Sequence, residues 1–120
     1  MSEVKLHIAG LDDFFSQARE AAREIDVGDL RERPAAIGFE SMELLLKVLT
    51  ANRWQLLRRL KKSGESSIRQ LAVALGRDYR GVHADVHALI DAGLIARDGK
   101  GLVSVPWEKI TAEMAIDIAA

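Results

Sequence analysis

The stretch from Ser66 to Ile95 constrains the fold of this chain most strongly, because two helical patterns meet there across a glycine. In its first half, apolar residues recur with helical spacing at Ile68, Leu71, Ala72 and Leu75. Gly76 ends this pattern, since glycine readily adopts the left-handed conformation that closes a helix. Asp78 is placed to cap a second helix, whose apolar face consists of Val82, Val86, Leu89 and Ile90. The stretch therefore predicts two short helices joined by a tight turn, a helix-turn-helix motif.

A β-hairpin is expected after Gly93, where the second helix ends. The pair Asp98-Gly99 lies between two apolar runs, residues 94–95 and 102–105. Asp-Gly in this position favours a tight hairpin, because both central positions of such a turn favour positive φ. The hairpin would form the wing of a winged helix.

Two further helices are expected before the motif. Ser41 can cap one that runs to Leu49, and Thr50 can cap the next, which runs to about Lys62. The residues expected to face inward from the second of these are Trp54, Leu57 and Leu60, with Leu56 as a further candidate.

The outer segments carry patterns of their own. Val4, Leu6 and Ile8 alternate with polar residues, as in a short strand, and a second short strand is expected from Ala35 to Phe39. Helical spacing is found at 11–27, and again at 107–118, where one side holds Trp107, Ile110, Met114 and Ile118. We expect a mainly α chain with a small β wing (α+β). Its parts would be a strand-helix extension at 1–40, a winged helix-turn-helix at 41–106 and a C-terminal helix at 107–120.

The composition of the chain limits the classes of protein to which it can belong. The 120 residues are 48% apolar, enough for the core of about one domain, and they include no cysteine that could form a disulfide or a thiolate metal site. No apolar run approaches the roughly 20 residues of a membrane helix, so we expect a cytoplasmic protein with no membrane partner. We expect neither enzyme activity nor a cofactor, because the chain has no glycine-rich phosphate loop and no nucleophile elbow.

Charge is distributed unevenly along the chain. Residues 1–50 carry a net charge of −4, residues 51–105 carry +5 and residues 106–120 carry −2. The positive charge therefore coincides with the helix-turn-helix region, as expected for a protein that binds double-stranded DNA.

The succession of helices and hairpin from Thr50 to Val105 resembles the winged helix-turn-helix regulators of the MarR and ArsR type. The residues that carry the resemblance are Asn52-Arg53-Trp54-Gln55-Leu56-Leu57, Ser67-Ile68-Arg69-Gln70-Leu71-Ala72, Val82-His83-Ala84-Asp85-Val86-His87-Ala88-Leu89 and Gly93-Leu94-Ile95. The whole chain, including Leu11-Asp12-Asp13-Phe14-Phe15 and Phe39-Glu40-Ser41-Met42-Glu43, looks like a family of small regulators commonly encoded beside a toxin candidate. The resemblance implies a sequence-specific transcriptional regulator that acts as an autorepressor or as the antitoxin of a toxin–antitoxin pair. The chain lacks the long flanking dimerisation helices of MarR proteins, so their effector pocket is not carried over.

The second helix of the motif would enter the major groove. Its side opposite Val82, Val86 and Leu89 would face DNA. The residues expected at the DNA are Ser67, Arg69, Arg77, Tyr79, Arg80, His83, Ala84, His87, Arg97 and Lys100.

Different roles are expected among these residues. Arg80 and Arg77 are candidates for reading guanine, because the guanidinium fork matches its O6 and N7 atoms. Arg69 and Ser67 suit phosphate, and the wing residues Arg97 and Lys100 suit phosphate or the minor groove. Tyr79 would either contact the DNA backbone or pack against the turn. Asp85 points sideways and is expected to pair with an arginine.

Two other classes of function remain open from the residues alone. His83, His87 and Asp91 stand one turn apart on one side of the helix, a spacing that can hold zinc, so a metal-sensing ArsR-like regulator is one alternative. The acidic outer segments suggest the other, a protein-interaction module without specific DNA binding. We also expect a homodimer assembled through the N-terminal strand and helix, with or without the C-terminal helix. Any co-encoded toxin is expected to bind the terminal segments and not the recognition helix.

Overall fold

The computed structural model describes residues 2–8 and 35–114, which divide between two compact units. One unit, Leu46–Glu108, contains three helices and a β-hairpin, and the other contains a three-stranded sheet. The boundary between the units falls within α2 (Met42–Val48). This helix begins after Ser41, and the Ser41 hydroxyl accepts a hydrogen bond from Leu44 N at 3.1 Å. The helix expected at 11–27 and residues 115–118 of the C-terminal helix lie outside the described residues. Within the described part, no helix is long and apolar enough to cross a membrane.

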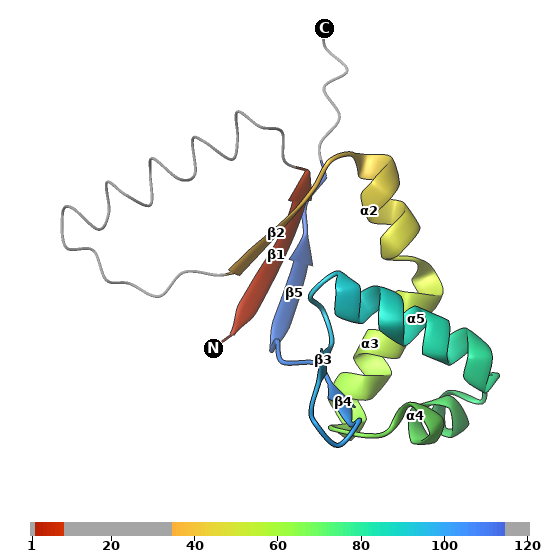
Figure 1. Ribbon diagram of the computed structural model, residues 1–120. Coiled ribbons are helices and arrows are strands. Elements are labelled where there is room, and N and C mark those ends of the chain that lie inside the picture. Colours follow the sequence, from red (N-terminus) through yellow and green to blue (C-terminus); the bar gives the residue numbers. More distant parts are fainter. Residues whose placement is uncertain (1, 9–34, 115–120) are drawn as a thin grey trace, which may run out of the picture. The chain divides into compact units, whose positions relative to one another are not determined.

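The helical unit consists of α3 (Ala51–Ser63), α4 (Ile68–Leu75) and α5 (Tyr79–Asp91) (Figure 1). Each helix buries one apolar side. The buried residues are Leu56, Leu57 and Leu60 of α3, Ile68, Leu71 and Ala72 of α4, and Val82, Val86 and Leu89 of α5. The structure confirms the two helices and the intervening turn that the sequence predicts between residues 66 and 93.

Local hydrogen bonds fix the ends of these helices. Thr50 caps α3 by accepting from Arg53 N at 3.3 Å, and Asp78 caps α5 by accepting from Gly81 N at 3.3 Å. Ser67 and Gln70 form a reciprocal capping box at the start of α4, in which each side chain accepts from the other residue's backbone N–H. Gly76 closes α4 with a φ of 64°, a left-handed conformation that glycine adopts without a Cβ clash.

The inward position expected for Trp54 is wrong. Its exposed fraction is 37%, whereas Leu56, for which the helical spacing was less decisive, is fully buried. At 100° per residue, Leu56, Leu57 and Leu60 define a narrow stripe, and Trp54 falls to one side of it.

The hairpin forms with a different turn from the expected one. Strands β3 (Ala96–Arg97) and β4 (Val103–Ser104) pair antiparallel. Positive φ occurs at Gly101 and not at Asp98 or Gly99, and Gly101 N donates to Asp98 O at 3.2 Å. This is a longer loop, with a β-turn followed by a left-handed glycine.

The second unit contains a parallel sheet with the strand order β2-β1-β5. Its strands are β1 (Glu3–Ile8), β2 (Ala35–Phe39) and β5 (Lys109–Ala112). The strands expected near residues 4–8 and 35–39 are therefore confirmed. Val4 and Leu6 alternate inward and are fully buried, as the period of two predicts.

The helix expected at 107–118 is wrong where the structure describes it. Lys109–Ala112 is strand β5, and Val4 pairs with Ile110 and Leu6 with Ala112. The spacing of Trp107, Ile110 and Met114 suits a helix, but pairing with β1 determines the conformation instead, because a local pattern is weaker than a ladder of backbone hydrogen bonds with a distant strand. Strands β1, β2 and β5, which come from both ends of the described chain, thus belong to one unit.

We expect Leu89→Ala to lower the free energy of unfolding by about 2–5 kcal/mol, because it leaves a cavity at a fully buried position. Val73→Ala on α4 is the control, since Val73 is 79% exposed and its truncation should change the free energy by roughly 0.5 kcal/mol or less. Urea unfolding of both variants measures the difference. Equal effects would contradict the assigned core.

Candidate nucleic-acid interface

Helix α5 has an outward side that carries one basic, one small and one acidic side chain. Val82, Val86 and Leu89 are buried, and helical geometry places Arg80, Ala84 and Asp91 on the opposite side, where all three are exposed. Arg80 lies in the first turn, and its guanidinium has no ion-pair or hydrogen-bond partner among the described residues. It is therefore available for an external anion.

An aromatic column runs along one flank of α5. The guanidinium carbon of Arg69, on α4, lies 4.9 Å from the centroid of the Tyr79 ring. The ring centroids of Tyr79 and His83 are 5.6 Å apart, and those of His83 and His87 are 4.2 Å apart. These three rings recur every four residues, so they lie along one side of the helix. The column ties α4 to α5 through a cation–π contact that the sequence did not reveal.

The aromatic column concerns two expectations from the sequence, the role of Tyr79 and the metal-sensor alternative. Tyr79 packs beneath Arg69 and remains 40% exposed, so packing between the helices is one of its roles. His83 and His87 pack against each other, and the described residues include no group of three or more His, Cys, Asp or Glu that could hold a metal ion. The metal-sensor alternative therefore gains no support from these residues.

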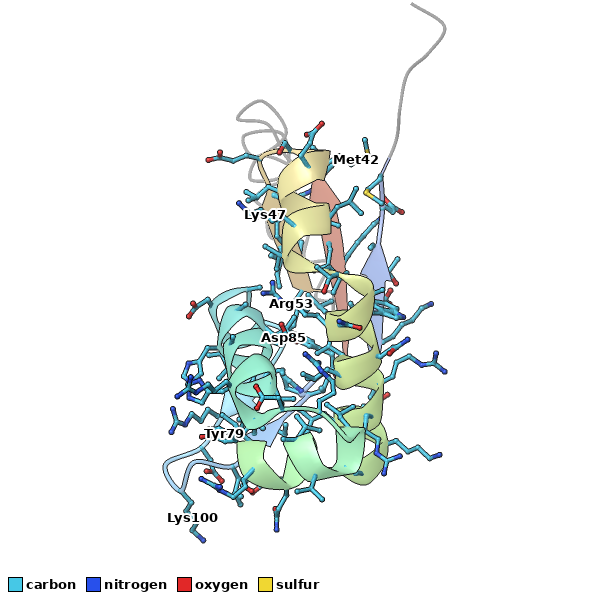
Figure 2. The ribbon with its side chains drawn as sticks, turned by 90° about the vertical axis from the view of Figure 1, so that its right-hand side faces the viewer. Met42, Lys47, Arg53, Tyr79, Asp85 and Lys100 are labelled. Carbon is cyan, nitrogen blue, oxygen red and sulfur yellow. The ribbon has the colours of Figure 1, made fainter. Side chains whose placement is uncertain are left out.

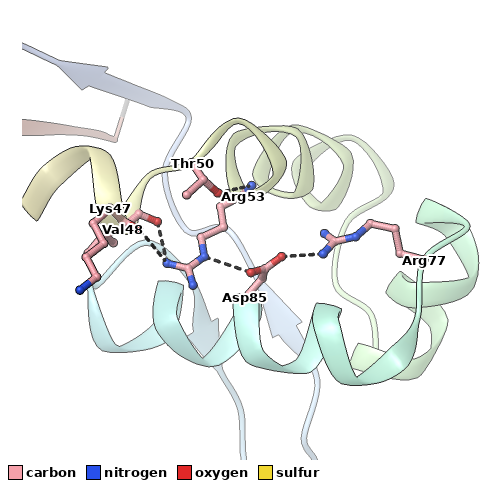
Figure 3. Close-up of polar contacts among 6 residues, drawn as sticks. All are labelled: Lys47, Val48, Thr50, Arg53, Arg77 and Asp85. Carbon is pink, nitrogen blue, oxygen red and sulfur yellow. Dashed lines mark hydrogen bonds and ion pairs between the residues drawn. The ribbon is translucent and has the colours of Figure 1, made fainter. Parts of the chain in front are cut away.

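The other flank of α5 holds a network of half-buried charges (Figure 3). Asp85 accepts a hydrogen bond from Arg53 Nε at 3.0 Å through Oδ1 and from an Arg77 terminal nitrogen at 2.8 Å through Oδ2. The exposed fractions of the three side chains are 15%, 21% and 31%, in the order Asp85, Arg53 and Arg77. The prediction that Asp85 pairs with an arginine is confirmed, with two arginines in place of one.

The network changes the interpretation of Arg77. The sequence placed this arginine on the exposed side, free to read a base. The structure places its guanidinium against Asp85, in the turn between α4 and α5. Arg77 thus joins the turn to the middle of α5, and of the two candidate base-reading arginines only Arg80 is unpaired within the described residues.

Arg53 is a member of this network that sequence reasoning missed. Besides binding Asp85, it donates through one terminal nitrogen to Val48 O at 2.9 Å and to Lys47 O at 3.5 Å. These carbonyls lie at the C-terminal end of α2. The separation of 32 residues between Arg53 and Asp85 hid the pair, because nothing local in the sequence relates the two positions.

The hairpin presents its basic residues to solvent. Arg97 and Lys100 are exposed, and Figure 2 shows Lys100 and Tyr79 on the same side of this unit. Asp98 shapes the loop between them by accepting hydrogen bonds from Lys100 N at 2.8 Å and from Leu102 N at 2.9 Å. The backbone N–H of Leu102 has the largest effect and lowers the pKa of the Asp98 carboxyl; desolvation opposes it, and the N–H of Lys100 lowers the pKa further.

The remaining predicted contact on α4 is Ser67. Its hydroxyl oxygen accepts from Gln70 N at 3.1 Å in the capping box, and its side chain is half-buried. The hydroxyl hydrogen is not used by that bond, and Arg69 lies exposed two residues later. The start of α4 therefore offers one donor and one cation.

Comparison with known proteins identifies the family. The chain belongs to the HVO_A0114 family, whose model matches residues 48–112, from the end of α2 to the end of β5. No curated protein matched the chain, and no solved structure did.

We expect the Asp98 carboxylate to stabilise the hairpin in a pH-dependent way. Because its pKa is lowered in the folded state, its contribution is present above the ordinary pKa and is lost as the pH falls below about 4 and the carboxylate takes up a proton. The melting temperature of Asp98→Ala should therefore lie below that of the unsubstituted chain at pH 7, and the two should converge toward pH 2.5. Thermal unfolding across this range is the measurement. A gap that stays constant down to pH 2.5 would contradict the role of the charge.

Proposed function

We propose that this protein is a DNA-binding transcriptional regulator with a winged helix-turn-helix fold, in which α5 is the recognition helix. The observation that carries the proposal is the outward side of α5, where exposed Arg80 and small Ala84 lie opposite a buried apolar side. A helix with these two sides can pack on its own domain and still approach base edges in the major groove.

The distribution of charge along α5 indicates which end of the helix would lie deepest in the major groove. Arg80 lies in the first turn, whereas Asp91 lies at the last residue on the same outward side. A carboxylate repels DNA phosphates, so the first half of α5 would lie deepest in the groove. Recognition helices commonly contact bases with their first turns.

Cations on the neighbouring elements suit the phosphate backbone. Arg69 on α4 and Arg97 and Lys100 on the hairpin are exposed. None of them belongs to α5, so they would fix the position of the protein on DNA without reading sequence. Ser67, His83 and His87 would add polar contacts beside them.

The regulatory role rests on the resemblance to MarR-like and ArsR-like proteins. We propose a dimeric autorepressor, because two such domains on a two-fold axis fit two half-sites about one turn of DNA apart. An antitoxin role with a co-encoded toxin rests on the resemblance alone, and the protein-interaction module remains the competing function.

The test is selection of duplexes by the full chain from a random library, followed by binding in a salt series. We expect a consensus duplex to emerge and log K to fall linearly with log salt concentration. Failure to enrich any sequence, together with weak binding at low salt, would favour the protein-interaction module.

Substitutions at three basic positions separate base reading from phosphate contact. We expect Arg80→Ala to cost about 1–3 kcal/mol on the selected duplex and to relax preference at one base position. Arg69→Ala and Lys100→Ala should weaken binding to selected and scrambled duplexes alike, and each should reduce the salt slope by about one unit. Equal losses on both duplexes for Arg80→Ala would make Arg80 another phosphate contact and would move base reading to His87.

We also expect the full chain to be a homodimer at micromolar concentration. Sedimentation equilibrium between about 1 and 100 μM, with and without the selected duplex, measures the mass. A monomer throughout the range that binds DNA as a monomer would contradict the dimeric arrangement.

A further inference from the structure

We propose that Arg53 is a positioning residue for sequence reading, which sets the rotation of α5 about its own axis without touching DNA. The inference rests on the proposed function, because it concerns how the recognition helix is aimed. It assigns a role to a side chain that, from the sequence alone, is expected to face solvent or phosphate.

Arg53 is held at both ends of its guanidinium. One terminal nitrogen donates to Val48 O at 2.9 Å, and Nε donates to Asp85 at 3.0 Å (Figure 3). Its backbone is fixed as well, since its N–H donates to the Thr50 cap of α3. The residue therefore connects the end of α2 to the middle of α5 through its side chain and is fixed at the start of α3 through its backbone.

The hydrogen bonds of Arg53 fix the orientation of α5 more specifically than the contacts of its apolar side do. Burial of Val82, Val86 and Leu89 holds α5 against the domain, but hydrophobic burial is non-directional. A charge-assisted hydrogen bond between a planar guanidinium and a carboxylate has a preferred geometry. The Arg53–Asp85 pair therefore opposes rotation of α5 in a way that aliphatic contacts do not.

Small rotations of α5 matter on its outward side. A helix with its side chains has a radius of roughly 5–6 Å, so a turn of about 10° displaces the outward surface by about 1 Å. Bidentate recognition of guanine by an arginine does not tolerate such a displacement well. Arg80 lies on that surface, whereas the expected phosphate contacts Arg69 and Lys100 lie on other elements.

The burial of Arg53 argues against direct contact with phosphate. Only 21% of its side chain is exposed, and two of its three nitrogens already donate to protein oxygens. Arg77 completes the network by occupying the other oxygen of Asp85. The carboxylate is thus held from two sides, once from α3 and once from the turn before α5.

The test compares Arg53→Gln and Arg53→Lys in the full chain, using the duplex selected by the unsubstituted protein and a scrambled duplex of the same composition. We expect both variants to lower the ratio of the two affinities, by about tenfold for Arg53→Gln, which is the discrimination that one base contact provides. Arg53→Lys keeps the charge but not the fork, so its loss should be smaller. Arg59→Gln is the matched control, because it removes one exposed charge from the same helix.

The ratio separates positioning from mere stability. A variant that is partly unfolded binds both duplexes less well by the same factor, so its affinity ratio does not change. If Arg53 were a phosphate contact, Arg53→Gln would reduce the salt slope by about one unit, as Arg69→Ala should; we expect no change in slope. An unchanged ratio for Arg53→Gln, or a reduced slope, would overturn the proposal.

Asp85→Asn provides a second measurement if Arg53→Gln does not fold. It keeps the shape of the side chain and removes its charge, and we expect the same direction of change in the affinity ratio. In the double variant the loss should be smaller than the sum of the two single losses, because both substitutions break the Arg53–Asp85 pair, while Asp85→Asn also alters the contact with Arg77. Fully additive losses would overturn the link between Arg53 and α5.

If the unsubstituted chain selects no duplex, the proposed function itself fails. That result differs from selection of a duplex with an affinity ratio that Arg53→Gln leaves unchanged.

Discussion

The carboxylate of Asp85 is the point on which the arrangement of the helical unit depends. It is 15% exposed and lies between two guanidinium groups that come from α3 and from the turn before α5. Removing the carboxylate would leave two partly desolvated cations facing each other, a costly arrangement even where an intact pair contributes little net stability. Apolar burial brings the helices together, and this charge network specifies how they are oriented.

The two flanks of α5 are built from different chemistry. One flank carries the neighbouring, tilted rings of Tyr79, His83 and His87, with Arg69 over Tyr79, and the other carries Asp85 between two arginines. On the flank with the rings, Tyr79 is exposed and both histidines are half-buried. This flank tolerates adjustment, because ring contacts of this kind are weak and have several favourable geometries. The ionic flank is half-buried and fixed by short hydrogen bonds. The helix is therefore held firmly along one edge and more loosely along the other.

Local signals explain where the sequence predicted the structure and where it did not. The ends of α4 and the start of α5 could be predicted, because the capping residues bond to backbone groups no more than four positions away. These capping residues are Ser67, Gly76 and Asp78. Strand β5 could not, because its conformation depends on pairing with β1 about a hundred residues earlier. The candidate site follows the same rule: Arg80 and Ala84 follow from helical period, whereas the contacts of Arg53 with Asp85 and of Arg69 with Tyr79 depend on packing between helices.

The pairing of β1 with β5 also sets an order of events during synthesis. The chain enters the sheet unit, leaves it for the whole of Leu46–Glu108, and returns only at β5. Domains generally fold as units while the chain emerges, so the inserted helical unit is complete before the sheet can be. Until Lys109–Ala112 has left the ribosome, β1 lacks the partner for one of its two edges. The nascent protein would thus carry a formed helical unit and an unfinished sheet.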